Sequence, residues 1–319
     1  MGKAWISGAG GMMGSHLAEL LASNGEEVTA TYFNPTVDMK GINVAGFTEV
    51  NVLDWTSVFD SLKATKPTWI FHLAAQSYPT VSWARPTETL TTNIIGTVNV
   101  FEAVRRLELD ARIVVACSSA EYGSIPVAEL PVREDHVLQP LHPYGVSKVG
   151  QDLLAYQYFA NFGMDCLRAR IFNCTGPRKV GDAVSDFARR IVSLEREPNR
   201  SIVKVGNLHT RRAIVDVRDL NMGLVALAES GRAGEAYNLG GLEPHRIGDL
   251  LSIAVKHSTR TDLEVLQVDE LLRPSDEAVI WGDITKVATD TGWRPMIGIN
   301  ETIVDVLDYW RSKADLGSC

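Results

Sequence analysis

Three features of this chain predict an α/β fold built on a doubly wound parallel sheet. Strand-like and helix-like segments alternate through its first half, and a glycine-rich turn follows the first strand-like segment. The 319 residues are enough for a large core and a smaller C-terminal domain. Because strands that alternate with helices are joined by right-handed crossovers, the sheet is expected to be parallel and covered on both faces.

The individual elements follow from apolar runs and their spacing. A buried strand is expected from Lys3 to Ser7 because the stretch is short and apolar, and a helix covers residues 16–23, where leucines recur at helical spacing. Further strands are expected over residues 27–32, 47–52, 68–74, 112–117 and 165–172, and further helices over residues 55–65, 89–107 and 144–162. In such a sheet a ligand lies beyond the carboxyl ends of the strands.

The glycine-rich turn has the spacing of a dinucleotide-binding loop of the Rossmann type. Gly8, Gly11 and Gly14 stand between the first strand and the helix, within SGAGGMMG. Glycine lets the backbone approach a pyrophosphate closely, and the N-terminus of the following helix offers free N–H groups and the positive end of the helix dipole. The turn therefore predicts a phosphate cradle.

A second set of residues has the chemistry of proton transfer. Ser118 follows a predicted strand, and Tyr144 and Lys148 are four positions apart on a predicted helix, so both project from one face. An ammonium near a phenol favours the phenolate, so Lys148 is expected to lower the pKa of Tyr144. Such a tyrosine can exchange a proton with a ketone or a sugar hydroxyl, and Ser118 can hydrogen-bond the same oxygen. The three residues are predicted to be catalytic.

The composition argues against several classes of function. With a net charge of −8, no basic surface for nucleic acid is expected. The chain has no run of about 18 apolar residues. Its N-terminus enters a strand without a signal-peptide pattern, so a cytoplasmic protein without a membrane span is expected. The four cysteines lack metal-ligand spacing, so no metal site is expected.

Taken together, the motifs resemble the extended short-chain dehydrogenase/reductase family, in its branch that acts on nucleotide-sugars. The resemblance implies a Rossmann-type domain over residues 1–172, to which the chain returns at about residues 212–240, and a smaller domain over residues 173–319 that mainly binds the nucleotide-sugar. It covers nearly the whole chain. The matching segments are SGAGGMMGSHLAELL, HLAAQS, TTNIIGT, CSSAEYG, HPYGVSK, RIFNCTGP, KVGNLHTRRAIVDVRD, YNLGG, LRPSD and TGWRP.

Within that branch the chain is most similar to the enzymes around GDP-mannose, namely the 4,6-dehydratase and the reductase of its 4-keto-6-deoxy product. The dehydratases carry an acidic residue two positions after the catalytic Ser or Thr, as the base for the C5 proton, and Ala120 stands there. Glu121 could replace that base only if the loop slipped by one residue. The resemblance therefore implies reduction of GDP-4-keto-6-deoxymannose to GDP-rhamnose. A nucleotide-sugar 4-epimerase is the alternative, followed by a 4,6-dehydratase.

The resemblance also assigns residues to the ligands. A non-enzymatic dinucleotide sensor is not expected, because Tyr144 and Lys148 are both present.

Relatives commonly form homodimers through a helix bundle, and here the expected interface is Leu153, Leu154, Tyr158 and Phe159. The implied dinucleotide contacts are Gly8, Gly11, Met12, Met13, Gly14, Asn34, Asn51, Val52, Leu73, Ala74, Ala75, Tyr144 and Lys148. The implied nucleotide-sugar contacts are Gln76, Ser77, Ser119, Glu121, Asn173, Arg212 and Arg273.

The choice of dinucleotide depends on the end of the second strand. NAD-preferring relatives have an Asp or Glu there that holds the ribose hydroxyls. Here the stretch is Thr31-Tyr32-Phe33-Asn34, with no acid before Asp38 and no arginine for a 2′-phosphate. The stretch favours NADP(H) and leaves NAD(H) open.

Overall fold

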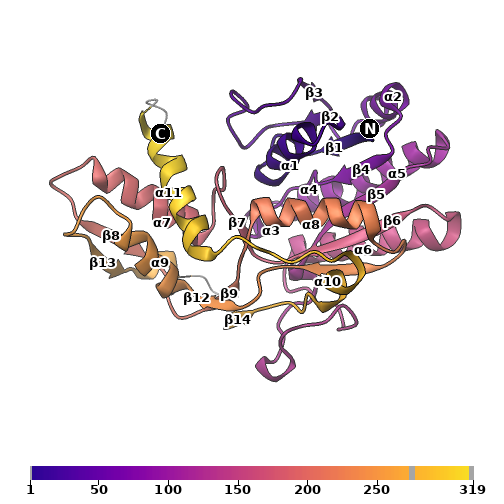
Figure 1. Ribbon diagram of the computed structural model, residues 1–319. Coiled ribbons are helices and arrows are strands. Elements are labelled where there is room, and N and C mark those ends of the chain that lie inside the picture. The colour runs from indigo at the N-terminus through magenta and orange to yellow at the C-terminus, as the bar shows by residue number, and fades with distance from the viewer. Residues whose placement is uncertain (1, 273–276, 316–319) are drawn as a thin grey trace. The chain divides into compact units, whose positions relative to one another are not determined.

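The computed structural model describes residues 2–272 and 277–315, and the chain forms two compact units (Figure 1). The first unit comprises the residues up to 171 together with 221–239 and 283–294. The second comprises residues 172–220, 240–282 and those from 295 onward. The chain therefore returns to the first unit twice, whereas the sequence analysis anticipates one return.

A parallel sheet forms the centre of the first unit, with the strand order β11-β6-β5-β4-β1-β2-β3. The order runs outward from β1 in both directions, so the switch point lies between β1 and β4, where Ser7 pairs with His72. Ligands bind at such a point. The strands are β1 Lys3–Ser7, β2 Glu27–Tyr32, β3 Phe47–Glu49, β4 Trp69–His72, β5 Arg112–Ser118, β6 Cys166–Ile171 and β11 Ala236–Leu239.

Both faces of this sheet are buried. Trp5 of β1 and Ile70 of β4 belong to one apolar cluster with Phe101 of a covering helix. Ala4 and Ile6 point to the opposite face and are buried as well, so the central strands read as apolar runs rather than alternating ones. The helices and turns are α1 Met12–Ser23, α2 Trp55–Thr65, α3 Pro79–Ala84, α4 Pro86–Leu90, α5 Gly96–Arg106, η2 Ser119–Glu121, η3 Val127–Glu129, α6 Pro143–Phe162, α8 Val217–Ser230, whose first residues belong to the second unit, and α10 Thr285–Thr291.

The predicted fold class is confirmed. The first helix begins at Met12 rather than at residue 16, and two other elements differ from the expectation. The third strand ends at Glu49 because the chain turns at Asn51, whose side chain accepts the Leu53 N–H at 3.0 Å. The helix expected over residues 89–107 is interrupted by a π-helical turn, η1 Thr91–Ile95. That wider turn carries the fully buried Asn93.

The second unit packs three helices around an apolar core that includes Phe187, Leu250 and Val306. Among the described residues, its short strands form three small sheets: β7 with β10, β9 between β12 and β14, and β8 with β13. Arg212 lies within β9. The elements are β7 Cys174–Thr175, α7 Ala183–Glu195, β8 Ile202–Val205, β9 Arg211–Ala213, β10 Val215–Asp216, β12 Pro244–Arg246, α9 Ile247–Lys256, β13 Glu264–Gln267, η4 Asp269–Leu271, β14 Val279–Ile280 and α11 Ile299–Asp315.

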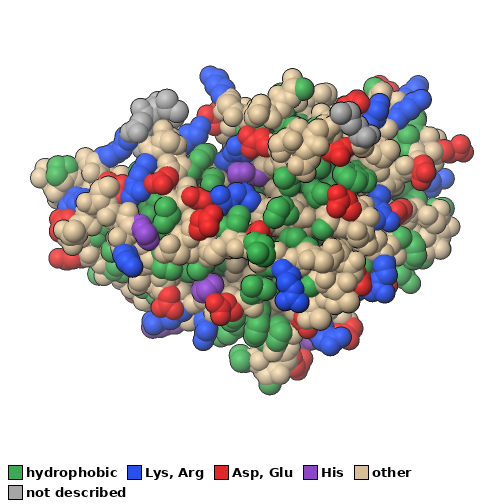
Figure 2. Space-filling model, viewed as in Figure 1, with side chains coloured by type: hydrophobic (Ala, Val, Ile, Leu, Met, Phe, Trp, Pro, Cys, Tyr) green, Lys and Arg blue, Asp and Glu red, His purple; other side chains and the backbone are tan. Residues whose placement is uncertain are grey.

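Charged side chains of both signs are interspersed on the face shown in Figure 2. Basic side chains do not form a continuous tract on this face, of the kind that a phosphate backbone requires. Over the described ranges, no helix combines the length and the apolar character needed to cross a bilayer.

Candidate active site

The glycine turn between β1 and α1 is packed too tightly for side chains at Gly8, Gly10 and Gly14. Gly8 has a φ of 77°, and a Cβ there would lie 2.8 Å from the Ala74 nitrogen. A Cβ on Gly14 would overlap the Gly8 carbonyl oxygen. Gly11 has more room, since a Cβ there would stay 3.4 Å from that oxygen. The shape of the turn therefore requires glycine at positions 8 and 14 more than at position 11.

This turn fits the pyrophosphate of a dinucleotide. Gly11 precedes α1 without a side-chain cap, so the first amides of the helix, at Met12, Met13 and Gly14, have no acceptor within the helix. Free N–H groups and the positive dipole end at a helix start stabilise anions. The residues present can hold the group that the sequence predicts.

Loops from neighbouring strands flank the turn. The Ser7 hydroxyl accepts the N–H groups of Leu73 and Ala74, each at 3.1 Å, which holds the loop after β4 beside the glycines. Ala75 follows and is half-buried. After β2, Asn34 adopts a left-handed φ of 49° and is exposed. These residues thus border the turn from two sides.

Asn51 and Val52 shape the loop after β3. The Asn51 side chain caps its own turn, and Val52 is buried against α5, where a Cβ on Gly96 would lie 2.8 Å from Val52 Cγ2. The Val52 carbonyl accepts the Asn99 side-chain amide at 2.9 Å. Both residues serve the structure of the loop, and their contact with an adenine ring stays a prediction.

Ser118, Tyr144 and Lys148 meet at the carboxyl end of β5. Ser118 is the last residue of the strand, and its side chain lies close enough to Tyr144, near the start of α6, to lower the pKa of the phenol. The Lys148 ammonium lies 5.7 Å from the centre of the Tyr144 ring. It donates to the Ala116 carbonyl at 2.7 Å. The structure brings together the three residues that the sequence predicts as catalytic.

Burial, rather than Lys148, dominates the acidity of Tyr144. Desolvation raises the pKa of Tyr144 to about 12; the hydrogen bond from Ser118 opposes this rise and the Glu121 charge adds to it. The expected lowering by Lys148 is therefore wrong. Desolvation also lowers the pKa of Lys148 to about 8, because removal from water penalises a phenolate and an ammonium alike.

Glu121, predicted to contact the sugar, is turned into the protein. Its side chain is fully buried, and Oε1 accepts the Ser118 N–H at 2.7 Å. The segment forms the 3-10 turn η2. A carboxylate in this position cannot reach a substrate, so that prediction is wrong. The same burial prevents Glu121 from replacing the missing base at Ala120.

The loop after β4 is held by its own side chains. Gln76 Nε2 donates to the Tyr78 carbonyl at 3.2 Å and to the Thr89 hydroxyl at 3.1 Å. Ser77 is exposed and Ser119 is half-buried. Both serines keep surface available for a ligand, whereas the Gln76 side-chain amide is already hydrogen-bonded within the loop.

The sequence analysis missed a buried polar chain behind the site. His72 contacts the Ser7 hydroxyl at 2.8 Å and the Thr97 hydroxyl at 2.9 Å. Asn93 donates to the Ser147 hydroxyl at 2.8 Å, on the helix that carries Tyr144. The signal that could have found this chain is the polar residues inside HLAAQS and TTNIIGT, which fall on otherwise buried elements.

The remaining substrate predictions fall in the second unit. The Asn173 carbonyl accepts the Val215 N–H at 2.9 Å, and its side-chain Oδ1 is buried without a hydrogen-bond partner in the described part of the chain. Arg212 is largely buried and donates to the Glu277 carbonyl at 2.8 Å. Arg273 lies outside the described residues.

One group of potential metal ligands is neutralised by an arginine. Donor atoms of Cys117, Glu121 and Asp152 lie within 4.8 Å of one another. Arg170 pairs with Asp152 at 2.8 Å and lies 3.5 Å from Glu121. Because the guanidinium already supplies the positive charge, this group does not make a cation site.

Comparison with known proteins decides the family. The family described as GDP-mannose 4,6 dehydratase matches residues 5–306. This chain belongs to the GDP-mannose 4,6-dehydratase family. Its sequence is 28% identical to GDP-6-deoxy-D-mannose reductase from Pseudomonas aeruginosa over 248 residues, which cover 77% of this chain and 81% of that one.

Among solved structures similar to this member of the GDP-mannose 4,6-dehydratase family, one holds NADPH and another holds NAD. RMD from Pseudomonas aeruginosa complexed with NADPH has a TM-score of 0.85 and 25% identity, covering 98% of this chain and 100% of that one. UDP-glucose 4-epimerase from Thermus thermophilus in complex with NAD has a TM-score of 0.84 and 26% identity, covering 97% and 99%. The family resemblance predicted from the motifs is confirmed.

Proposed function

We propose that this protein reduces the 4-keto group of a nucleotide-activated 6-deoxyhexulose, converting GDP-4-keto-6-deoxymannose into GDP-rhamnose with NADPH or NADH. One observation carries the proposal: Ser118 lies beside Tyr144 at the sheet edge, while Ala120 occupies the position of the dehydratase base. Since Glu121 is fully buried, the described Ser118 loop presents no carboxylate that could remove the C5 proton. Such a site suits reduction.

The side chains divide the proton chemistry between them. Tyr144, with its pKa raised to about 12, stays protonated at neutral pH and gives its proton to the oxygen that becomes an alkoxide at C4. The Ser118 hydroxyl hydrogen-bonds the same oxygen. Lys148, whose ammonium lies 5.7 Å from the centre of the Tyr144 ring, would hold the nicotinamide ribose. The bound coenzyme supplies the hydride.

NADPH is the proposed coenzyme. The stretch from Thr31 to Asn34 offers no carboxylate that would select the ribose hydroxyls of NADH and repel a 2′-phosphate. The similarity to a reductase structure that holds NADPH supports the same choice. NADH stays the alternative, since a similar fold holds NAD.

A nucleotide-sugar 4-epimerase is the second candidate. The same Ser118, Tyr144 and Lys148 can take a proton from a C4 hydroxyl and return it after the hydride has moved out and back. The fold shared with an NAD-bound UDP-glucose 4-epimerase favours this candidate. An epimerase recycles its coenzyme, so it consumes none from solution.

The deciding experiment follows the absorbance of NADPH, and separately of NADH, after purified protein is mixed with GDP-4-keto-6-deoxymannose. The expected result is oxidation of NADPH in proportion to substrate, with GDP-rhamnose as the product. No oxidation of either coenzyme would contradict the proposal. Conversion of UDP-glucose without net coenzyme consumption would then identify the epimerase.

The second unit is proposed to bind the nucleotide part of the substrate. Asn173, Arg212 and Arg273 are the proposed contacts, and the buried unpartnered Oδ1 of Asn173 supports a polar role there. Arginines suit a diphosphate through charged, bidentate hydrogen bonds. Arg212→Ala is expected to raise the KM for the GDP-sugar more than it lowers kcat.

A homodimer through α6 and a cytoplasmic location complete the proposal. Leu153, Tyr156 and Phe162 expose about half of their surface on this helix, whereas Leu154 and Tyr158 pack against the core and drop out of the interface expected from the sequence. Leu153→Glu should yield monomers in size-exclusion chromatography with light scattering. The free thiols Cys117, Cys166 and Cys174 suit a reducing compartment.

A further inference from the structure

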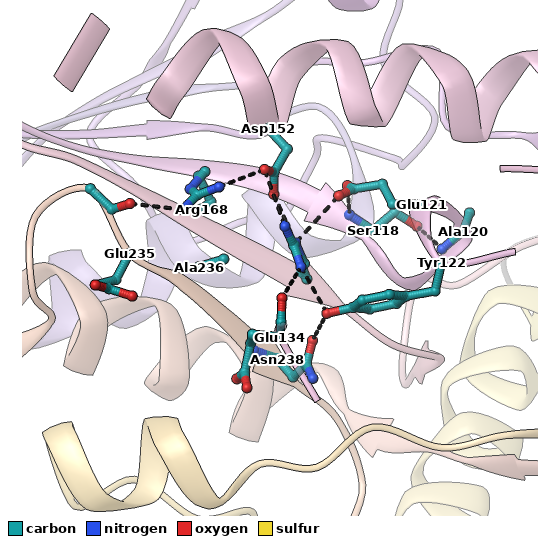
Figure 3. A network of polar contacts seen from close by, with 12 residues as sticks. Ser118, Ala120, Glu121, Tyr122, Glu134, Asp152, Arg168, Glu235, Ala236 and Asn238 are labelled. Carbon is teal, nitrogen blue, oxygen red and sulfur yellow. Dashed lines mark hydrogen bonds and ion pairs between the residues drawn. The ribbon is translucent and has the colours of Figure 1, made fainter. Parts of the chain in front are cut away.

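A glutamate side chain holds the backbone of Ser118 (Figure 3). The Ser118 N–H donates to Glu121 Oε1 at 2.7 Å, and the Ser118 hydroxyl accepts the Ala120 N–H at 3.2 Å. These reciprocal bonds form a capping box at the start of η2. Glu121 therefore fixes where β5 ends and how the Cα–Cβ bond of Ser118 is oriented.

Behind Glu121 lies a buried guanidinium. Glu121 Oε2 is 3.5 Å from Arg170 Nε and has no hydrogen-bond partner in the described structure. Arg170 donates to both oxygens of Asp152, at 2.8 and 3.2 Å. Its Nη1 donates to the Tyr122 hydroxyl at 3.0 Å and to the Glu134 carbonyl at 2.9 Å. These bonds fix the orientation of the cation that faces Glu121.

Asp152 closes the connection to the catalytic helix. It lies on α6 four residues after Lys148 and eight after Tyr144, so the three side chains share one helix face. A second cation, Arg168, pairs with it at 2.8 Å. We call Glu121, Arg170 and Asp152 the strut, because they join the Ser118 backbone to the helix that carries Tyr144.

The strut is buried, so the loss of one contact is not compensated by water. Burial, reinforced by the Asp152 charge, raises the pKa of Glu121 to about 8, and Arg170 opposes that rise. The ionised and the protonated carboxyl both keep an oxygen that accepts the Ser118 N–H. An apolar side chain at this position would leave a buried N–H without an acceptor. What Ser118 requires is therefore the acceptor rather than the charge.

We propose that Glu121 is a positioning residue, which sets through the strut where the Ser118 hydroxyl lies relative to Tyr144. It touches no substrate, in contrast to the role that the motifs first suggest. This inference rests on the proposed function, in which Ser118 and Tyr144 hydrogen-bond the same substrate oxygen. It assigns the reaction a determinant that lies beneath the site.

The test compares Glu121→Leu with Glu121→Gln in the NADPH-oxidation assay. Leucine removes the acceptor, so kcat should fall on the order of tenfold to a hundredfold while the KM for NADPH stays unchanged. Glutamine keeps an acceptor oxygen and should restore most of kcat. Glu102→Leu, which removes the two ion pairs of Glu102 with Arg105 and Arg106 and the hydrogen bond from Tyr158 at 3.0 Å, is the matched control and should leave kcat unchanged.

A double-mutant cycle with Ser118→Ala separates positioning from general damage. If Glu121 acts through the Ser118 hydroxyl, Glu121→Leu should lower kcat little further in the Ser118→Ala background. Additive losses, an equal loss in Glu121→Gln, or wild-type kcat in Glu121→Leu would each overturn the inference and leave the proposed function standing.

Absence of turnover in the wild type would instead refute the proposed function. Hydrogen–deuterium exchange then decides on Glu121, with the peptide covering residues 117–122 as the readout. Faster exchange at the Ser118 amide in Glu121→Leu, and protection in Glu121→Gln, would support the positioning of that backbone. Equal exchange in wild type and Glu121→Leu would overturn it.

Discussion

The glycine turn after β1 and the Ser118 loop after β5 lie at the same edge of one sheet but are built by different means. Backbone shape makes the glycine turn, because side chains do not fit at Gly8 and Gly14. Buried side chains make the Ser118 loop, where Glu121 holds the amide and Arg170 stands behind it. The first is specified by adjacent residues, and the second by residues from distant segments.

The difference predicts how each loop fails. Substitution in the glycine turn acts through steric overlap with backbone atoms, which cannot move aside cheaply. Substitution around Ser118 acts through lost hydrogen bonds and altered charge, so the size of its effect depends on pH. Activity, coenzyme affinity and stability should therefore separate the two loops.

Tyr144→Phe should give the largest effect, on the Ser118 side alone. Removing the proton donor is expected to lower kcat by roughly 10²- to 10⁴-fold. Dissociation constants for NADPH, measured by fluorescence titration, should change little because the glycine turn is untouched. Parallel loss of turnover and of NADPH binding would show that Tyr144 supports the fold rather than the reaction.

Gly14→Ala tests the glycine side, with Gly11→Ala as its matched control. A Cβ at position 14 overlaps the Gly8 carbonyl oxygen, whereas one at position 11 stays 3.4 Å from it. Overpacking should lower the free energy of unfolding of Gly14→Ala by about 1–3 kcal/mol and weaken NADPH binding. Urea denaturation and titration of both variants check this. Equal losses in the two variants would contradict the steric argument.

Glu121→Gln should flatten the pH dependence of stability. Because the pKa of Glu121 is raised to about 8, the folded protein holds a proton that the unfolded chain releases. The free energy of unfolding should then fall as pH rises from 4.5 to 8, by at most ~1.4 kcal/mol per pH unit. Urea denaturation across this range compares wild type with variant. Parallel curves would show that Glu121 does not hold the proton.

His72→Gln should have the smallest effect on the free energy of unfolding near neutral pH. The pH dependence that it removes runs in the opposite direction to that of Glu121. His72 contacts Ser7 beneath the glycine turn, and burial, with a contribution from the Lys148 charge, lowers its pKa to about 3. The unfolded chain therefore binds a proton that the folded protein excludes, and stability is lost as pH falls below 6.5. Acid titration of unfolding should be shallower in the variant; an unchanged profile would refute this assignment.

Local patterns predicted the fold class and the residues that the structure gathers at the sheet edge. Apolar runs located the strands, since both sheet faces are buried, and the glycine spacing located the turn. Ser118, Tyr144 and Lys148 were found because each stands at the end of a strand or on one helix face. Their roles in catalysis stay predictions.

The missed features depend on long-range packing. Arg170 contacts Asp152 and Glu121 through the packing of segments that are far apart in the sequence. No residue spacing in the sequence therefore predicts the strut. The pKa of Tyr144 was predicted in the wrong direction because a nearby lysine is visible in the sequence and desolvation is not. The exposed face of α6 was also predicted with the wrong residues, because burial is not visible in the sequence and Tyr158 points into the core.

The discontinuity of the first unit has a consequence for biosynthesis. The sheet closes with β11, whose Asn238 accepts the Tyr122 hydroxyl at 2.7 Å, and this strand follows more than forty residues of the second unit in the chain. On the ribosome, the segment that carries Ser118 and Tyr144 therefore emerges long before its last strand. A nascent chain ending at Ile171 exposes the edge of β6, and that edge stays open to pairing with other chains until synthesis passes residue 239.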